Sequence, residues 1–142
     1  MLGPRNSTSA RALSGFAVSG LNANFSNTHL KACDFTKADL AGAKFTRADF
    51  GASQFDRTVL PDADFRHADL SGVDFSRSDL SNAHFGGAKL FAADLRAANL
   101  TGARELTAGQ LTQARTDEST TLPNGSRGPY RRHSGAERPV LV

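Results

Sequence analysis

Large apolar residues recur along the middle of this chain at a fixed spacing of five positions. From residue 25 to residue 100, every fifth residue is Phe or Leu, which makes sixteen consecutive matches. A small residue (Ala, Ser, Thr, Cys or Val) stands two positions before each, and most of the residues in between are polar. We call the Phe and Leu positions the core ladder: Phe25, Leu30, Phe35, Leu40, Phe45, Phe50, Phe55, Leu60, Phe65, Leu70, Phe75, Leu80, Phe85, Leu90, Leu95 and Leu100.

Neither a helix nor a flat strand can use a period of five. In an α-helix each step of five residues turns by roughly 140°, so sixteen steps would scatter the ladder around every side. In a strand the faces alternate with period two, so successive ladder residues would point to opposite faces. The pattern therefore predicts a chain that bends in every repeat, with the small and the large residue of a short extended segment both facing inward.

A right-angle bend in every repeat closes a four-sided coil in twenty residues, and the sequence does repeat at this longer period. Phe recurs on a first wall from Phe25, and Leu recurs on a fourth wall from Leu40. The corner after the fourth wall carries residues that tolerate the positive φ of a type II turn, namely Gly42, Asp62, Asn82 and Gly102. Arg, Lys, Ala and His are commoner at the other three corners, so turns without positive φ are expected there.

The repeats resemble the motif A(D/N)Lxx of the pentapeptide repeat family, in which Leu or Phe stands at the centre. The motif reads ADL at residues 38–40 and 68–70, and ANL at 98–100. The resemblance implies an all-β solenoid, a right-handed quadrilateral β-helix of about four 20-residue coils, which we place at residues 23–105.

The repeat is interrupted at both ends, where a solenoid needs caps over its open core. After Leu100 the central position falls on Glu105, and Thr107 with Gln110 forms a capping-box pattern, which predicts a capping helix over 106–115. Residues 11–22 are apolar but out of phase, which indicates an irregular N-terminal cap. Residues 1–10 and the basic tail 116–142 are rich in Pro, Gly, Ser and charge, so both are expected to be disordered.

The composition of the chain says more about the cellular location of the protein than about its function. Cys33 is the only cysteine, which excludes an intramolecular disulfide and agrees with a reducing compartment. No segment is apolar enough to span a bilayer, and the N-terminus lacks the apolar run of a secretory signal, so a cytoplasmic location is expected. Residues 21–105 hold ten Lys and Arg against eleven Asp and Glu, so the net charge of +3 arises from the ends.

The polar residues show no arrangement typical of a catalytic, metal or cofactor site. His29, His67 and His84 fall on different walls and corners, and the many Asp residues before the ladder positions should point outward on a convex rod. We therefore expect no enzyme activity and no cofactor. The candidate surface contacts are one exposed aromatic residue and a basic row that recurs at one corner: Phe91, Lys37, Arg57 and Arg77.

These features favour a non-enzymatic scaffold or protein-interaction module with a protein partner, and they do not define its oligomeric state. The alternative is mimicry of duplex DNA, as the resemblance implies through the gyrase-protecting, fluoroquinolone-resistance members of the family. A mimic needs a long acidic rod. Here the expected rod has four coils and a charge near −1, which also argues against binding to nucleic acid itself.

Overall fold

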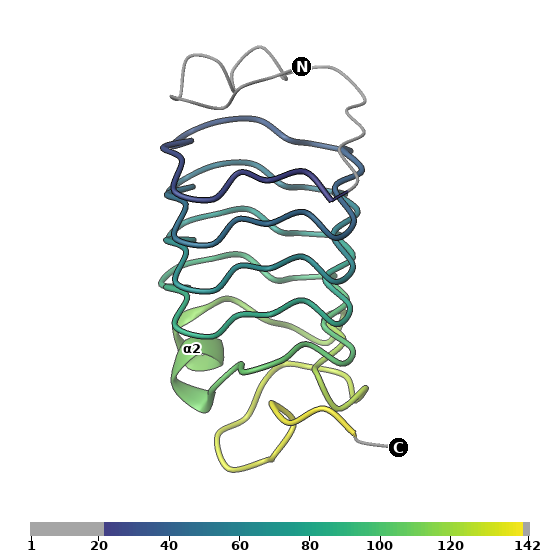
Figure 1. Ribbon diagram of the computed structural model, residues 1–142. Helices are drawn as coiled ribbons and strands as arrows, with labels where there is room; N and C mark the ends of the chain where they lie inside the picture. The colour runs from purple at the N-terminus through teal and green to yellow at the C-terminus, as the bar shows by residue number, and fades with distance from the viewer. Residues whose placement is uncertain (1–21, 141–142) are drawn as a thin grey trace.

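The chain winds as a stack of flat, closely similar turns. The computed structural model describes residues 22–140, so the predictions for residues 1–10, and for 11–22 apart from Asn22, lie outside the described residues. Figure 1 shows the turns stacked along one axis, with the short helix α2 (Ala108–Gln113) at one end and the C-terminal segment beyond it. Helix α2 is the one helix among residues 22–140, and the backbone there pairs through single bridges without extended strands.

The bridges confirm the predicted period of twenty. The residue before each ladder position pairs in parallel with its equivalent one coil later, as in the row that joins Asn24, Lys44, Asp64, His84 and Arg104. Each bridge has two hydrogen bonds; for example, His84 accepts from the Phe65 amide at 2.8 Å and donates to the Ala63 carbonyl at 2.9 Å. Because four such rows exist, each coil has four walls, and each wall is joined to the next coil by a single bridge, which we call a rung.

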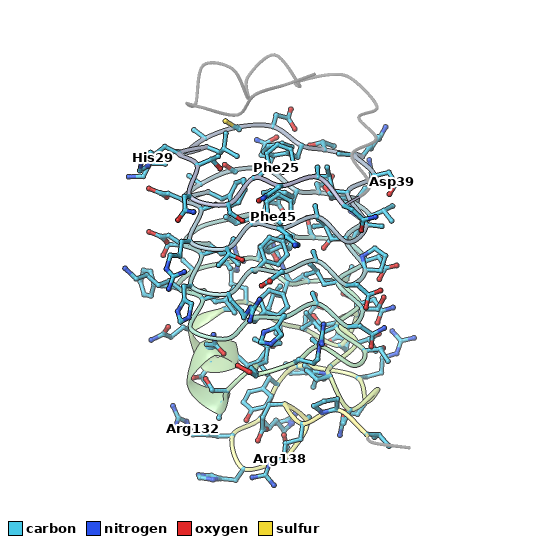
Figure 2. All side chains as sticks on the ribbon, in the orientation of Figure 1. Phe25, His29, Asp39, Phe45, Arg132 and Arg138 are labelled. Atoms are coloured by element: carbon cyan, nitrogen blue, oxygen red, sulfur yellow. The ribbon has the colours of Figure 1, made fainter. Side chains whose placement is uncertain are left out.

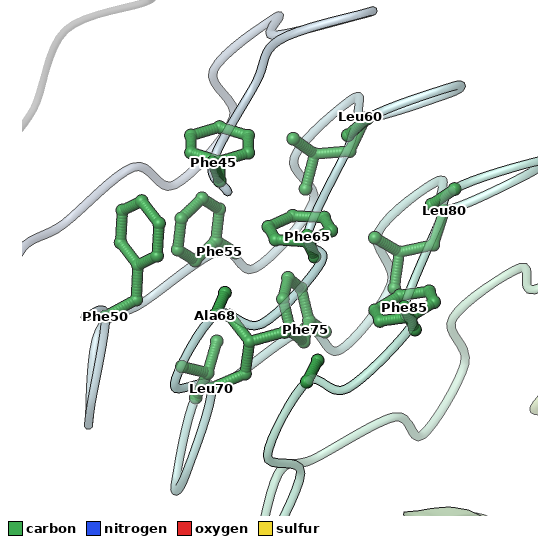
Figure 3. Close-up of a cluster of buried hydrophobic side chains, with 14 of the residues drawn as sticks. Phe45, Phe50, Phe55, Leu60, Phe65, Ala68, Leu70, Phe75, Leu80 and Phe85 are labelled. Carbon is green, nitrogen blue, oxygen red and sulfur yellow. The ribbon is translucent and has the colours of Figure 1, made fainter. Parts of the chain in front are cut away.

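The core ladder fills the interior of the coil. All sixteen ladder residues are buried, with at most 6% of any of them exposed. Phe45 stacks on Phe65 with ring centroids 4.9 Å apart, and it meets Phe55 of the opposite wall edge to face at 6.1 Å. Figure 3 shows these rings in columns that run along the axis. Both geometries are favourable for aromatic pairs, so the Phe columns add to the burial of apolar area.

The small inward positions include hydroxyl groups that would be costly to bury without partners. Ser53 donates to the Leu30 carbonyl at 2.7 Å and accepts from the Cys33 amide at 3.1 Å. Thr58 and Ser78 likewise donate to carbonyls of the ladder, at 3.1 and 2.6 Å. These hydroxyls therefore satisfy backbone groups at the inner edge of the corners while remaining small enough to fit beside Phe.

The corners differ from the prediction that only one of them needs positive φ. The second corner residue has a positive φ at all four corners, with values of 64° at Lys37, 61° at Ala52 and 60° at His67. The reason is geometric: the same tight turn is needed at every corner to bring the next pair of small and large residues inward. Arg, Lys, Ala and His thus adopt a left-handed conformation that costs L-residues roughly 1–2 kcal/mol each.

Ala97 provides a test of this corner strain, since its φ is 62° and its methyl group is exposed. We expect Ala97→Gly to stabilise the protein by roughly 0.5–1 kcal/mol, because relief of the left-handed strain exceeds the added entropy of the unfolded chain. Ala98→Gly next to it should destabilise, since Ala98 is buried. Urea unfolding of both variants measures the two effects, and the same sign in both would contradict the assignment.

Helix α2 replaces one wall of the fifth turn. Thr107 caps it, and the predicted capping box is present, with Thr107 and Gln110 each accepting from the other's backbone amide. The helix is shorter than the predicted range of 106–115 because Ala114 is already extended. Leu106 and Leu111 are buried against the end of the core, so the helix covers the last Phe and Leu residues from solvent.

The prediction of disorder for 116–142 is wrong over 116–140. Thr121 bridges to Asn99, so this segment completes the fourth wall of the fifth turn, and Arg115 just before it completes the third wall by bridging to Asp94. Thr120 and Leu122 are buried, and Thr120 donates to the Leu95 carbonyl at 2.8 Å. A segment of low apolar content is thus ordered by the unpaired backbone edge of the preceding coil. The composition of the segment does not reveal this partner.

Candidate interaction surface

The outward residues lie in straight rows, because each position recurs one layer further along the rod, about 4.8 Å away. Figure 2 shows that polar and charged side chains cover the flanks of the stack. We focus on the third wall, which carries the bridged row of Asp34, Gln54, Asp74, Asp94 and Arg115, together with the corners on either side of it. All the predicted surface contacts lie at these two corners.

The basic row lies at the corner after the third wall. Lys37, Arg57 and Arg77 are all exposed and occupy the same corner position in successive layers, and we call them the basic ladder. The Arg77 side chain contacts Asp56, with Nε 3.2 Å from Oδ1. The row ends in the next layer at Ala97. Three cations therefore line one edge of the third wall.

Phe91 lies at the opposite edge of this wall, at the corner before it. Its side chain is 67% exposed, far more than any other described Phe, and the neighbouring Ala92 amide donates to the Gln113 carbonyl of helix α2 at 2.9 Å. Val59, the other outward apolar residue of the repeats, is 40% exposed and lies on the fourth wall. Phe91 is therefore an exposed apolar side chain on a backbone held by the C-terminal cap.

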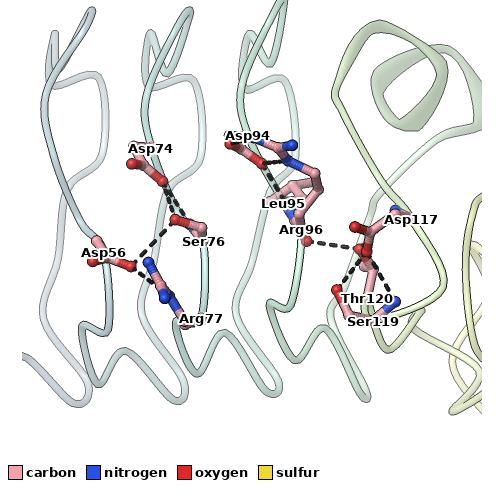
Figure 4. A network of polar contacts seen from close by, with 10 residues as sticks. All are labelled: Asp56, Asp74, Ser76, Arg77, Asp94, Leu95, Arg96, Asp117, Ser119 and Thr120. Carbon is pink, nitrogen blue, oxygen red and sulfur yellow. Dashed lines mark hydrogen bonds and ion pairs between the residues drawn. The ribbon is translucent and has the colours of Figure 1, made fainter.

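The last layers of the third wall are hollowed, together with the corner that follows this wall. The depression has a volume of about 400 Å³ and is lined by Asp74, Ser76, Arg77, Asp94, Arg96, Ala97 and Asp117. Figure 4 shows how the polar side chains here bind one another: Arg96 pairs with Asp94 at 2.8 Å, and the Ser76 hydroxyl lies 3.2 Å from Asp56. Asp117 was missed as a surface residue because the tail that carries it was expected to be disordered.

The histidines remain apart, on separate rows. His84 lies 3.5 Å from Glu105, His67 lies over Gly87, and His29 is exposed on the second wall. Among residues 22–140, no group of three His, Cys, Asp or Glu side chains is placed to hold a metal ion. No helix within the same residues is long and apolar enough to cross a membrane.

The family model for pentapeptide repeats matches this chain in eight copies, which span residues 23–62, 60–96, 68–104 and 78–115. The matched residues cover more than half of the chain and end at the residue where the third wall of the fifth turn begins. The chain belongs to the pentapeptide repeat family.

Solved structures similar to this pentapeptide repeat protein are members of the same family. HetL from Nostoc sp. strain PCC 7120, a protein involved in regulation of heterocyst differentiation, is 33% identical over 66% of this chain and 41% of its own, with a TM-score of 0.47. Rfr23 from Cyanothece 51142 is 22% identical over 73% of this chain and 84% of its own, with a TM-score of 0.45. A trypsin-treated form of QnrB1, a plasmid-mediated fluoroquinolone resistance protein, is 23% identical over 63% and 66%, with a TM-score of 0.34. No curated protein sequence matches the chain.

The Asp residues that precede the core ladder of this pentapeptide repeat protein also have a structural role. The carboxylate before a ladder residue accepts a hydrogen bond from the backbone amide two residues later, as Asp64 does from Arg66 and Asp79 from Ser81, each at 3.0 Å. Asn99 makes the same bond to Thr101. This is an Asx turn, which explains why the motif accepts Asp or Asn at this place.

Two of these carboxylates also pair with the arginine that follows. The Arg66 guanidinium donates to both oxygens of Asp64 and holds the pKa of that carboxyl below its ordinary value of 3.8. Arg96 lowers the pKa of Asp94 in the same way. Since the pKa is lower in the folded state, each pair stabilises the fold above about pH 4, and the contribution is lost as the pH falls below it.

We therefore expect part of the acid destabilisation to depend on these two pairs. In Asp64→Asn with Asp94→Asn, the free energy of unfolding should fall less steeply below about pH 4 than in the original protein, because Asn keeps the Asx turn without titrating. Replacing Arg66 and Arg96 by Gln should weaken the same slope by removing its cause. Urea unfolding between about pH 6 and pH 2.5 measures it, and an unchanged slope in both variants would contradict the expectation.

Proposed function

We propose that this protein is a non-enzymatic interaction scaffold that binds a partner protein along the third wall. The proposal rests on two features of this wall: an exposed aromatic side chain, Phe91, lies at one edge, and the basic ladder lies at the other. Exposed aromatic and arginine side chains are the residue types that most often anchor protein interfaces. The rigid stack keeps both edges in register.

The character of the wall supports binding more than catalysis. Its charged groups are engaged with one another, as in the pairs of Arg77 with Asp56 and Arg96 with Asp94. The depression between them is open and shallow, and it offers no enclosed site in which a carboxylate or amine would be held ready for proton transfer. A surface of this kind contributes complementary charge and shape to a partner.

Both signs of charge on the wall favour a protein partner. A duplex-DNA mimic would present acid rows, whereas here Lys37, Arg57 and Arg77 follow one edge. Binding to nucleic acid would be opposed by the acidic row of Asp34, Asp74 and Asp94 on the same wall.

We expect the protein to act in the cytoplasm, in keeping with its single buried cysteine, Cys33. Family membership leads us to expect the right-handed sense of coiling.

The proposal is tested by capture of partners from cells with two matched double variants. Phe91→Ser with Arg57→Glu alters the edges of the third wall. Val59→Ser with Arg47→Glu likewise replaces an exposed apolar residue by Ser and an exposed Arg by Glu, on the fourth wall and at the corner after the first. A partner on the third wall should be retained by the second variant and lost by the first. Equal loss in both, or no specific partner for the unaltered protein, would contradict the proposal.

A further inference from the structure

The far C-terminal segment concentrates positive charge at one end of the rod. Residues 119–140 contain four arginines, Arg127, Arg131, Arg132 and Arg138, against one acidic residue, Glu137. All four arginines are exposed. As a disordered tail this segment would be an ordinary solvated basic stretch. The structure instead holds it in a folded loop, which changes what the arginines can do.

Several hydrogen bonds fasten the loop to the fifth turn. The Tyr130 amide donates to the Thr116 hydroxyl at 2.9 Å, and the Asn124 amide donates to the carbonyl of Ala136 at 3.0 Å. Ala136 is buried, and Tyr130 packs against the end of the hydrophobic core. The backbone between residues 127 and 138 is therefore held at both ends and in the middle.

Glu137 is occupied inside the loop. The Tyr130 hydroxyl donates to its Oε1 at 2.9 Å, and only 15% of the Glu137 side chain is exposed. Hydrogen bonds from its own backbone amide and from Tyr130 lower the pKa of this carboxyl, so it remains ionised and bound. The one acidic residue of the segment thus helps to hold the loop in place. Nε of Arg138 lies 3.6 Å from Oε2 of Glu137, but the Arg138 side chain is 84% exposed.

Two of the four arginines, Arg132 and Arg138, lie near the pair of Tyr130 and Glu137. Arg132 and Arg138 both act electrostatically on the Tyr130 hydroxyl, and His133 acts on Glu137, which places the three side chains in one neighbourhood. Arg132 reaches the Thr112 hydroxyl of helix α2 at 3.4 Å. Among the described residues, Arg127 and Arg131 make no ion pair. Figure 2 shows Arg132 and Arg138 at the end of the rod, beyond the last turn.

We propose that this C-terminal end is a second docking surface, which binds an acidic segment of a protein through Arg127, Arg131, Arg132 and Arg138. Guanidinium groups held on a folded loop can pair with carboxylates at low entropic cost, because the backbone is already ordered. The inference extends the proposed interaction role to another part of the molecule and does not require a partner on the third wall.

An acidic peptide fits this end better than a nucleic acid does. A continuous phosphate backbone would extend past the loop and meet Asp117 and Glu118, which precede it, and the carboxylates of the third wall beyond them. Single strands also need exposed aromatic faces for stacking, whereas Tyr130 is partly buried with its hydroxyl engaged. A short segment rich in Asp and Glu can end where the basic surface ends.

The test measures binding of a fluorescent peptide of about ten residues rich in Asp and Glu, by anisotropy, to the full chain. We expect saturable binding at low salt that weakens steeply as the salt rises, because exposed charges are screened. Arg131→Glu with Arg132→Glu should weaken binding by at least tenfold. Lys44→Glu with Arg47→Glu makes the same charge change on exposed cations of the repeats that belong to neither proposed surface, and should weaken binding by less than about threefold.

Three results would overturn the inference: no binding to the unaltered protein at low salt, equal loss in both variants, or tighter binding to duplex DNA or to anionic vesicles than to the peptide. Thermal unfolding of both variants controls for folding, and Arg131→Gln with Arg132→Gln takes the place of the Glu variant if that one unfolds. A partner captured through the third wall without any peptide binding would remove this inference while leaving the proposed function intact.

Discussion

Replacing Phe65 by aspartate should unfold the coil, while the same replacement at Phe91 should leave it folded. Phe65 is fully buried, stacked between Phe45 and Phe85 at 4.9 and 5.5 Å. A carboxylate at this place would either lie charged in an apolar interior or force the layer open, and the change would also remove the four ring contacts that Phe65 makes. The expected loss exceeds about 5 kcal/mol, which is comparable to the whole stability of a typical domain.

Phe91→Asp is the matched control, because it makes the same chemical change at a side chain that is 67% exposed. Its effect on the free energy of unfolding should stay within about 0.5 kcal/mol, as is usual for surface positions. Circular dichroism with a thermal scan measures both variants. Similar melting of the two would mean that the inward direction of the core ladder is wrong.

Gln110 is expected to have the second largest effect, because its side chain completes a missing rung of the coil. In the earlier coils the carbonyls of Thr28, Ala48 and Ala68 each accept from a backbone amide of the next coil at 2.9 Å. The corresponding carbonyl of Ala88 accepts from no backbone amide of the next coil, because helix α2 replaces the wall that would supply one. Nε2 of Gln110 donates to it at 2.9 Å instead.

The same amide group also donates to the Phe85 carbonyl at 2.9 Å, and its oxygen accepts from the Thr107 amide at 2.8 Å. Gln110→Ala would leave three backbone groups without these partners, two of them at the partly buried end of the core. At about 0.5–1.5 kcal/mol for each bond, we expect a loss of about 2–3 kcal/mol. Urea unfolding gives this value directly.

Gln113→Ala is the control within the same helix. Its side chain is exposed and has no hydrogen bond within residues 22–140, while its backbone carbonyl, which accepts from Ala92, is unaffected by the change. The variant should lose less than about 0.5 kcal/mol. Equal losses in both variants would show that helix α2 as a whole, and not the side chain of Gln110, seals the coil.

The candidate surface was only partly accessible from the sequence. Phe91 could be found because it is an apolar residue at an outward position, and the basic ladder because it recurs every twenty residues. The phase of the repeat then places both at corners. Asp117 and the arginines of the C-terminal loop could not be placed, because their segment has no repeat. Their position depends on backbone rungs such as those of Arg115 and Thr121 with the coil below.

The five-residue period alone determines the interior of this protein. Sixteen Phe and Leu residues with a small residue two places earlier can all be buried only if the chain bends in every repeat, so the four-sided coil and its core follow from the sequence. Hydrophobic burial is strong and independent of direction, which is why a simple spacing carries so much information.

The tertiary structure decides the features that depend on stacking. All four corners take positive φ, even at Lys37 and Arg57, because each rung must align with the next coil whatever the local residue prefers. The open edge of the last coil similarly recruits the side chain of Gln110 and the segment 115–123 to satisfy its backbone groups. Such partners are about twenty residues away along the chain, so no local pattern could reveal them.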